Sequence, residues 1–202
     1  MSRHIDRLFY LMHILAISPG RDIEVSRWAA VAKSGIDALM IREKQMSVRS
    51  ILNLGQQIKD LAPNLPLWVN DRLDAALALG VGFHGGEDYP QLPASICEIS
   101  RPLHNIAQIS ERRESDQLLI SPIFDVPDKS EPIGIRGLHG ILDNMPPWRG
   151  KLLALGGINP KNAAALQHHR LDGIALIRGI WDSVNPNGIV DKLRNAWKEN
   201  KC

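Results

Sequence analysis

Charged residues follow several short apolar runs of this 202-residue chain, and their types suit the binding of a polyanion. Arg42 and Lys44 stand on either side of Glu43, directly after the run Ala38–Ile41. Arginine can bind a phosphate through two parallel hydrogen bonds, whereas lysine acts as a point charge. The pair is therefore a candidate clamp for a phosphate or a pyrophosphate, with a rim of salt bridges as the alternative.

Two glycine-containing turns near the C-terminus suit a phosphate in another way. The stretch LLALGGINPKNA contains Gly156 and Gly157, and the stretch DGIALIRGIW contains Arg178 and Gly179. Each passes from an apolar run through glycine to a helix start, and glycine lets backbone N–H groups approach a ligand closely. Two such turns in succession are typical of the phosphate site that follows strands 7 and 8 of a (β/α)8 barrel.

Other polar residues at predicted strand ends suit a metal ion or proton transfer. Asp71 and Asp88 follow neighbouring strands and could hold Mg²⁺, which binds through one or two carboxylates together with substrate phosphates. The alternative for Asp71 is to cap the helix that begins at Arg72. His104 follows the fifth strand and is the best acid–base candidate, because histidine titrates near neutrality. A structural role is the alternative for His104.

The pattern of apolar runs predicts the elements that must position these residues. Most runs are continuously apolar, as expected for parallel strands that are buried on both faces. Eight strands with interleaved helices favour one (β/α)8 barrel domain over residues 1–202, with the helix after the fourth strand reduced to turns; an open doubly wound sheet is the alternative. The predicted strands are Phe9–Ile14, Ala38–Ile41, Leu67–Val69, Gly82–His84, Ile96–Ser100, Leu118–Ile120, Leu152–Leu155 and Gly173–Ile177. The predicted helices are Glu24–Ser34, Val48–Leu61, Arg72–Leu79, Ile106–Arg113, Leu138–Asn144, Pro160–His168 and Gly188–Glu199.

Composition excludes several classes of protein. The net charge is +2 with scattered basic residues, which gives no support for nucleic-acid binding. The chain has two cysteines, Cys97 and Cys202, which argues against a disulfide framework and fits a reducing cytoplasm. The longest apolar run, Leu8–Ile17, is too short to span a bilayer and is read as a strand. Nothing in the composition decides between a monomer and a homo-oligomer.

At these residues the chain resembles the thiamine phosphate synthase and TenI superfamily, roughly from Leu8 to Ser183. The matching pieces, specific in their order and combination, are IREK, VNDRLDAALALGV, GEDYP, SPIFDVPDK, GIRGL, ALGGI and DGIALIRGI. The resemblance implies a (β/α)8 barrel and substrates that are an aminopyrimidine diphosphate and a thiazole phosphate. Carried over by position, Arg42, Lys44, Asn70 and Lys129 would contact pyrophosphate, and Asp71 and Asp88 would bind Mg²⁺. Gly156, Gly157, Arg178 and Gly179 would hold the thiazole phosphate.

The sequence departs from the synthase pattern at several positions. Met40 stands where the pattern has glutamine, and Pro102 stands where it has serine. Val126 and Asp128 replace two threonines, and Arg178 replaces a serine in the phosphate turn. The loss of hydroxyl donors and the added carboxylate of Asp128 should weaken a polyanion site.

Three hypotheses follow. The leading one is a TenI-like thiazole tautomerase, in which His104 transfers the proton that aromatises a thiazole phosphate carboxylate. The second is a divergent Mg²⁺-dependent thiamine phosphate synthase, which the retained carboxylates support because a tautomerase does not need them. The third is a relative that binds the ligand, or regulates, without turnover.

Overall fold

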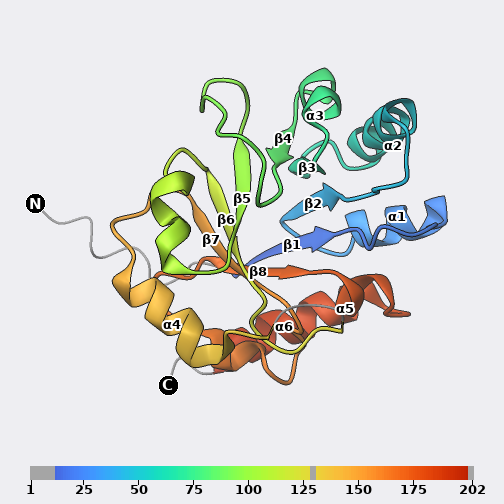
Figure 1. Ribbon diagram of the computed structural model, residues 1–202. Helices are drawn as coiled ribbons and strands as arrows, with labels where there is room; N and C mark the ends of the chain where they lie inside the picture. Colours follow the sequence, from blue (N-terminus) through green and yellow to red (C-terminus); the bar gives the residue numbers. More distant parts are fainter. Residues whose placement is uncertain (1–11, 128–130, 200–202) are drawn as a thin grey trace, which may run out of the picture.

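The computed structural model describes residues 12–127 and 131–199, and its strands form one closed, parallel barrel. The strands pair in chain order, and the last strand returns to pair with the first (Figure 1). The prediction of a (β/α)8 barrel is confirmed, and the open doubly wound sheet is wrong. In order, the strands are β1 (His13–Ile17), β2 (Ala38–Ile41), β3 (Leu67–Asn70), β4 (Gly82–His84), β5 (Ile99–Leu103), β6 (Gln117–Ile120), β7 (Lys151–Leu155) and β8 (Gly173–Leu176).

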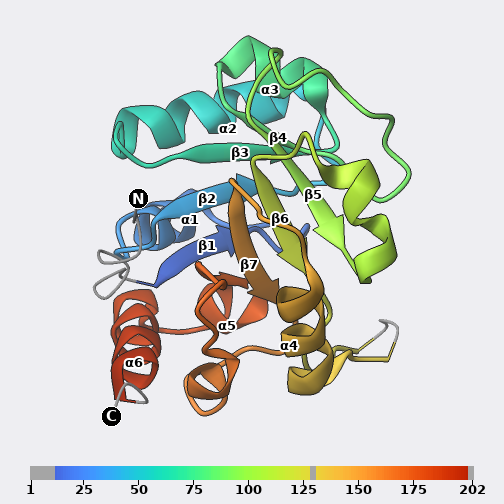
Figure 2. The same ribbon diagram turned by 90° about the vertical axis from the view of Figure 1, so that its left-hand side faces the viewer.

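Helices cover the outside of the barrel, with α2 and α3 on one side and α4 and α6 on the opposite side (Figure 2). Two of the crossovers are single 3₁₀ helices, η2 and η3, and the described segment between β4 and β5 contains turns and no helix. These short connections explain how about 200 residues close a barrel, as the sequence analysis predicted for the fourth crossover. The helices are α1 (Val25–Ala32), α2 (Val48–Leu61), α3 (Leu73–Leu79), η2 (Ile106–Arg112), α4 (Gly134–Asn144), η3 (Ala163–Leu166), α5 (Arg178–Trp181) and α6 (Pro186–Glu199).

The core has two layers, because alternate residues of each strand point into the barrel or toward the helices. The barrel interior is narrow at one place, where a Cβ atom added to Gly82 would lie 2.4 Å from the Trp68 ring. Glycine at this position of β4 therefore makes room for the Trp68 indole inside the barrel. The interior layer consists of Leu15, Ile17, Ala38, Met40, Trp68, Leu119, Leu153 and Ala175.

Two predicted strands were displaced by several residues. β1 runs over His13–Ile17 and not Phe9–Ile14, of which residues 9–11 lie outside the described part of the chain. β5 runs over Ile99–Leu103 and not Ile96–Ser100, so Arg101 and Pro102, which the prediction left outside the strand, belong to it. Beyond Ser100, β5 pairs with β6 but has no register partner in β4, and proline is tolerated at such an edge.

Helix boundaries also differ from the predicted ones, most of all near the phosphate turns. The predicted helix Pro160–His168 is only the 3₁₀ turn Ala163–Leu166, and the four-residue helix α5 was not predicted. None of the described helices is long and apolar enough to cross a membrane. The assignment of all 202 residues to a single domain stays a prediction.

Candidate active site

A cavity of about 800 Å³ lies at the carboxyl ends of the barrel strands, where (β/α)8 barrels carry their active sites. Seven of the predicted site residues line this cavity, whereas Lys44, Asp71 and Asp88 stand outside its lining, and Lys129 lies outside the described residues. A separate cavity of about 590 Å³ at the amino ends of β3 and β4 contains none of the predicted residues. The seven residues are Arg42, Asn70, His104, Gly156, Gly157, Arg178 and Gly179.

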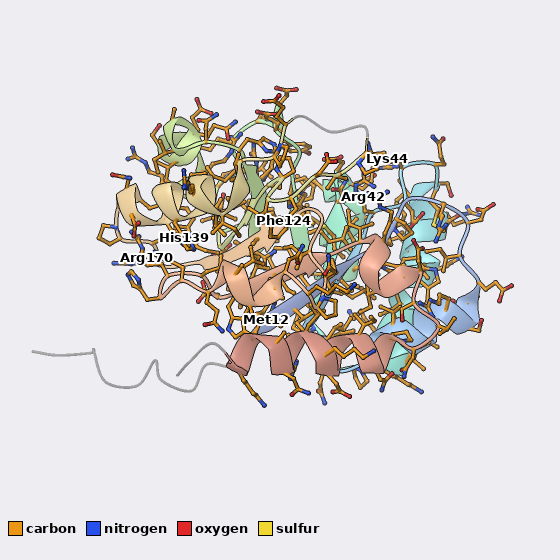
Figure 3. The ribbon with its side chains drawn as sticks, turned by 90° about the horizontal axis from the view of Figure 1, so that it is seen from below. Met12, Arg42, Lys44, Phe124, His139 and Arg170 are labelled. Carbon is orange, nitrogen blue, oxygen red and sulfur yellow. The ribbon has the colours of Figure 1, made fainter. Side chains whose placement is uncertain are left out.

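The end of β2 presents Arg42 to the cavity and Lys44 to the solvent beside it. The backbone N–H of Arg42 donates to Ser18 Oγ at 2.7 Å, which ties β2 to the loop after β1. Figure 3 shows Arg42 and Lys44 close together on one side of the molecule, far from His139 and Arg170. Neither cation forms an ion pair with another described residue, so the alternative of a salt-bridged rim finds no support among these residues.

The carboxylate of Asp71 is held in a fixed orientation at the end of β3. Its Oδ1 accepts a hydrogen bond from the Gly86 backbone N–H at 2.9 Å, and its Oδ2 accepts one from Asn70 Nδ2 at 2.7 Å. The residue adopts a left-handed backbone conformation with φ 56°, and α3 has no side-chain cap at its start. The alternative in which Asp71 caps this helix is therefore wrong. The two hydrogen bonds instead orient the carboxylate, as hydrogen-bonding neighbours of a metal ligand do in metal sites.

The residues near Asp71 fit a magnesium ion that arrives with a phosphate. In the described part of the chain, no group of three or more His, Cys, Asp or Glu side chains could hold a metal. Mg²⁺ does not need such a group, because it binds through one or two carboxylates plus phosphate oxygens and water. Asp71 is oriented by Gly86 and Asn70, and Asp88 lies exposed two residues after Gly86. This arrangement suits a metal shared with a ligand and does not suit a metal bound by the protein alone.

Two buried arginines hold the loop between β4 and β5, which carries the GEDYP motif. Arg101, on β5, donates to the main-chain oxygens of Glu87 at 3.1 Å, Tyr89 at 2.7 Å and Pro90 at 3.3 Å. Arg112, on η2, donates to the same Glu87 oxygen at 3.1 Å. A helical crossover would satisfy these carbonyl groups internally, so the guanidinium groups replace the missing helix. Sequence reasoning placed Arg101 after the strand; it lies within β5 and is 5% exposed.

His104 is held in one tautomer by a main-chain oxygen at the end of the neighbouring strand, β6. Its Nδ1 lies 2.6 Å from the Ser121 carbonyl oxygen, which can only accept, so Nδ1 carries the proton. The Nε2 atom is then a lone-pair acceptor and lies 3.8 Å from Glu87 Oε2. Gln108 positions both residues, because its Oε1 accepts from the His104 N–H and its Nε2 donates to Glu87 Oε1. A histidine with a bare Nε2 at a cavity wall can act as a general base.

His84 is a second histidine of the cavity, and it stands at the end of a strand that the sequence predicted. It is the last residue of β4, and its Nδ1 lies 2.8 Å from Ser100 Oγ, which accepts from Gln117 Nε2. Burial lowers the pKa of His84 to about 4. The imidazole is therefore neutral at physiological pH and offers a hydrogen-bonding group, not a charge, to the cavity.

The two glycine turns form the opposite wall of the cavity. Gly156 and Gly157 have φ values of 113° and 64°, and a Cβ atom at Gly157 would lie 2.7 Å from Phe124 Cβ. The turn therefore requires glycine for both conformation and space. The backbone N–H groups of Gly157, Arg178 and Gly179 donate no hydrogen bond to any described residue, and they border the same cavity. Free N–H groups gathered at a helix start suit an anion.

Arginines of the first crossover support this wall from outside. Arg27, on α1, donates to the main-chain oxygens of Ile180 at 2.7 Å, Trp181 at 2.9 Å and Ser183, and so fixes the C-terminal end of α5. Arg21, in the loop before α1, forms an ion pair with Asp182, and both line the cavity. Sequence reasoning missed Arg21 and Asp182, because no local pattern marks them.

A closed barrel with the cation of Arg42 on one wall of its carboxyl-end cavity and two glycine turns on the other has the architecture of phosphate-binding (β/α)8-barrel enzymes. The chain belongs to the thiamine monophosphate synthase family, whose pattern it matches over residues 14–180. The chain is 30% identical to the thiamine-phosphate synthase of Syntrophomonas wolfei, covering 96% of this chain and 98% of the relative. It is 32% identical to the thiamine-phosphate synthase of Albidiferax ferrireducens, covering 82% and 81%.

The solved structures agree with the barrel fold. A thiamine phosphate pyrophosphorylase from Pyrococcus furiosus superposes with a TM-score of 0.80 at 22% identity, covering 96% of this chain and 98% of that one. Family membership confirms the resemblance and the prediction of a thiamine-biosynthesis enzyme. The relatives named above are synthases, which favours the synthase hypothesis over the tautomerase hypothesis that the sequence analysis put first.

Proposed function

We propose that this protein is a Mg²⁺-dependent thiamine phosphate synthase, which joins an aminopyrimidine diphosphate to a thiazole phosphate and releases pyrophosphate. The observation that carries the proposal is one cavity with two separate walls suited to anions. Arg42 and Asn70 form one wall, next to the oriented Asp71 carboxylate, and the turns at Gly157 and Gly179 form the other. A reaction between two phosphorylated molecules needs two such subsites with their reactive ends between them.

In this mechanism the pyrophosphate wall stabilises the departing charge. The C–O bond to the diphosphate breaks with its electron pair on the leaving oxygen, and Arg42, Lys44, Asn70 and Lys129 hold that group. Asp71 and Asp88 would hold Mg²⁺, which supplies further neutralisation of the pyrophosphate when bound. Positioned positive charge of this kind is the main source of catalysis when negative charge develops in the transition state.

The apolar floor of the cavity then protects the pyrimidine cation until it is captured. Ile17, Met40, Leu119 and Ala175 form this floor and present no hydroxyl, amine or carboxylate group. The thiazole nitrogen attacks the cation, and the new C–N bond completes thiamine phosphate without any proton transfer. Water would compete for the same carbon, so exclusion of water by the floor favours the correct product. Met40 also explains why a glutamine contact of the synthase pattern is lost here.

A second candidate function, the thiazole tautomerase, is favoured by the geometry of His104. Its fixed Nδ1–H tautomer leaves Nε2 as a base at the cavity wall, beside Glu87. In that reaction His104 Nε2 removes a proton from the thiazole phosphate carboxylate and returns one to the isomer, while the glycine turns hold the phosphate. General acid–base catalysis of this kind contributes about 10²–10⁴-fold.

Two matched substitutions separate these functions. If the protein is a synthase, Asp71→Asn removes the oriented carboxylate with little change of volume, and we expect it to lose Mg²⁺-dependent thiamine phosphate formation. We expect His104→Gln to retain much of that activity. In the tautomerase the dependence is reversed, and a chelator has little effect. Calorimetric titration with the aminopyrimidine diphosphate, with and without Mg²⁺, tests the pyrophosphate wall directly. If the protein binds thiazole phosphate but shows turnover neither in the synthase assay nor in the tautomerase assay, the non-catalytic hypothesis is the one that remains. Cytoplasmic location stays a prediction, and a homo-oligomer stays an alternative to a monomer.

A further inference from the structure

Asp182 places a negative charge on the wall where the proposed function puts a phosphate. It directly follows α5, and its backbone N–H donates to the Arg178 carbonyl oxygen at 2.9 Å. Among the described residues that line the cavity, only Asp182 and Glu87 are acidic. A carboxylate beside a phosphate opposes its binding by repulsion between like charges. The site therefore needs a cation that offsets Asp182 or takes over the phosphate.

Arg21 is that cation, and its ion pair with Asp182 is easily exchanged. Both side chains are largely exposed, 61% for Arg21 and 47% for Asp182. An exposed ion pair contributes little to stability, whereas a guanidinium binds a phosphate strongly through paired hydrogen bonds. The pair is not needed to anchor α5, because Arg27 already donates to three carbonyl oxygens of this segment. Arg21 can therefore leave Asp182 without loosening the phosphate wall.

The loop that carries Arg21 lies between the two walls of the cavity. Gly20, with φ 77°, packs on β2 so closely that an added Cβ atom would lie 3.2 Å from the Arg42 carbonyl oxygen and 3.3 Å from its Nη1. Barrel closure places β1 next to β8, so the same loop also borders α5 (Figure 1). Arg21 consequently reaches the phosphate wall from the side of Arg42.

We propose that Arg21 is a substrate-binding residue that exchanges Asp182 for the phosphate monoester held by the glycine turns, and that Asp182 competes for it and limits the affinity. This inference rests on the proposed function, because it assumes a thiazole phosphate on that wall. It assigns a specificity role to two residues that lie 161 positions apart in the sequence.

A double-mutant cycle on the full chain tests the inference. Thiazole phosphate alone is titrated calorimetrically into wild type, Arg21→Gln, Asp182→Asn and the double variant, at fixed ionic strength. We expect Arg21→Gln to raise the dissociation constant about tenfold or more, as for the loss of a hydrogen bond to a charged group. We expect Asp182→Asn to lower it. In the double variant, the loss of Arg21 still costs about tenfold relative to Asp182→Asn alone. Arg49→Gln, an exposed arginine on α2, is the control for the change of net charge.

Each other outcome overturns the inference in a recognisable way. Equal binding by Asp182→Asn and the double variant would show that Arg21 only neutralises Asp182 and does not bind the phosphate. In a parallel titration of the same four proteins with aminopyrimidine diphosphate, a change in affinity confined to that ligand would place Arg21 on the pyrophosphate wall. If the wild type binds thiazole phosphate and Arg21→Gln binds it with the same affinity, the inference is rejected and the proposed function is not. Failure of the wild type to bind thiazole phosphate would reject the proposed function and the inference together.

Discussion

The buried His84 should make the stability of the fold depend on pH in a calculable way. Burial lowers the pKa of its imidazole from 6.5 to about 4 in the folded chain, against a partial opposing effect of Asp71. Below pH 6.5 the unfolded chain takes up a proton that the folded chain excludes. Stability that is fully present above pH 6.5 is therefore lost as the pH falls toward 4, and no more is lost below that value.

The size of this effect follows from the two pKa values. At pH 5, protonation of this histidine raises the population of the unfolded chain about 30-fold. The folded chain, in which the imidazole stays neutral at this pH, gains almost nothing. This ratio corresponds to about 2 kcal/mol of stability lost between pH 8 and pH 5 from His84 alone. Burial also lowers the pKa of His13 and His168, so both act in the same direction.

Replacement of His84 by Asn removes the titrating group and keeps a polar atom near Ser100. Urea unfolding of both proteins at pH 8, 7, 6 and 5, in chelator and without ligands, gives the free energy of unfolding. We expect the wild type to lose about 2 kcal/mol more than His84→Asn over this range. Ser100→Ala is the matched control, because it removes the hydrogen-bonding partner but leaves the buried imidazole, and it should keep the wild-type pH dependence. Equal pH dependence in wild type and His84→Asn would refute the reasoning.

Two further substitutions test the walls of the cavity. Gly157→Ala forces a residue with φ 64° to carry a Cβ atom 2.7 Å from Phe124 Cβ, so thermal unfolding should show a loss of at least about 1–2 kcal/mol, and the KM for thiazole phosphate should rise. Gly140→Ala, on an open face of α4, should be neutral or stabilising, and destabilisation there equal to that at Gly157 would contradict the argument. Arg101→Met removes three hydrogen bonds to carbonyl oxygens of the loop that carries Asp88. We therefore expect it to raise the Mg²⁺ concentration needed for half-maximal synthase activity. An unchanged Mg²⁺ dependence would show that the loop keeps its position without Arg101.

The sequence was sufficient for the barrel and for most strand ends. Parallel strands buried on both faces leave continuous apolar runs, and β2, β4 and β7 therefore lie where the pattern predicted. The glycines at 156 and 157 were also readable, because two positive φ values in succession leave a mark in the sequence. These are local effects, and local patterns can report them.

The parts that could not be predicted depend on contacts between segments that are distant in the sequence and lie at the ends of neighbouring strands. Arg101 reads as a loop residue, yet it is buried in β5 because carbonyl groups of a distant loop surround its guanidinium. Asp71 stands before a helix, where an aspartate often caps the first turn. Its carboxylate instead accepts a hydrogen bond from the backbone N–H of Gly86. Arg21 meets Asp182 only because β8 closes on β1. None of these partners is a sequence neighbour, so no spacing rule could find them.

Glu87 connects the two halves of the site, and this affects how variants should be interpreted. Its main-chain oxygen is held by Arg101 and Arg112, and its side chain lies between Gln108 and the His104 imidazole. The next residue in the chain is the proposed metal ligand Asp88. A change that loosens this loop therefore disturbs the metal side and the histidine side together, and it would reduce either activity. Only substitutions that alter one side chain and spare the loop can distinguish a synthase from a tautomerase, which is why Asp71→Asn and His104→Gln are informative where Arg101→Met is not.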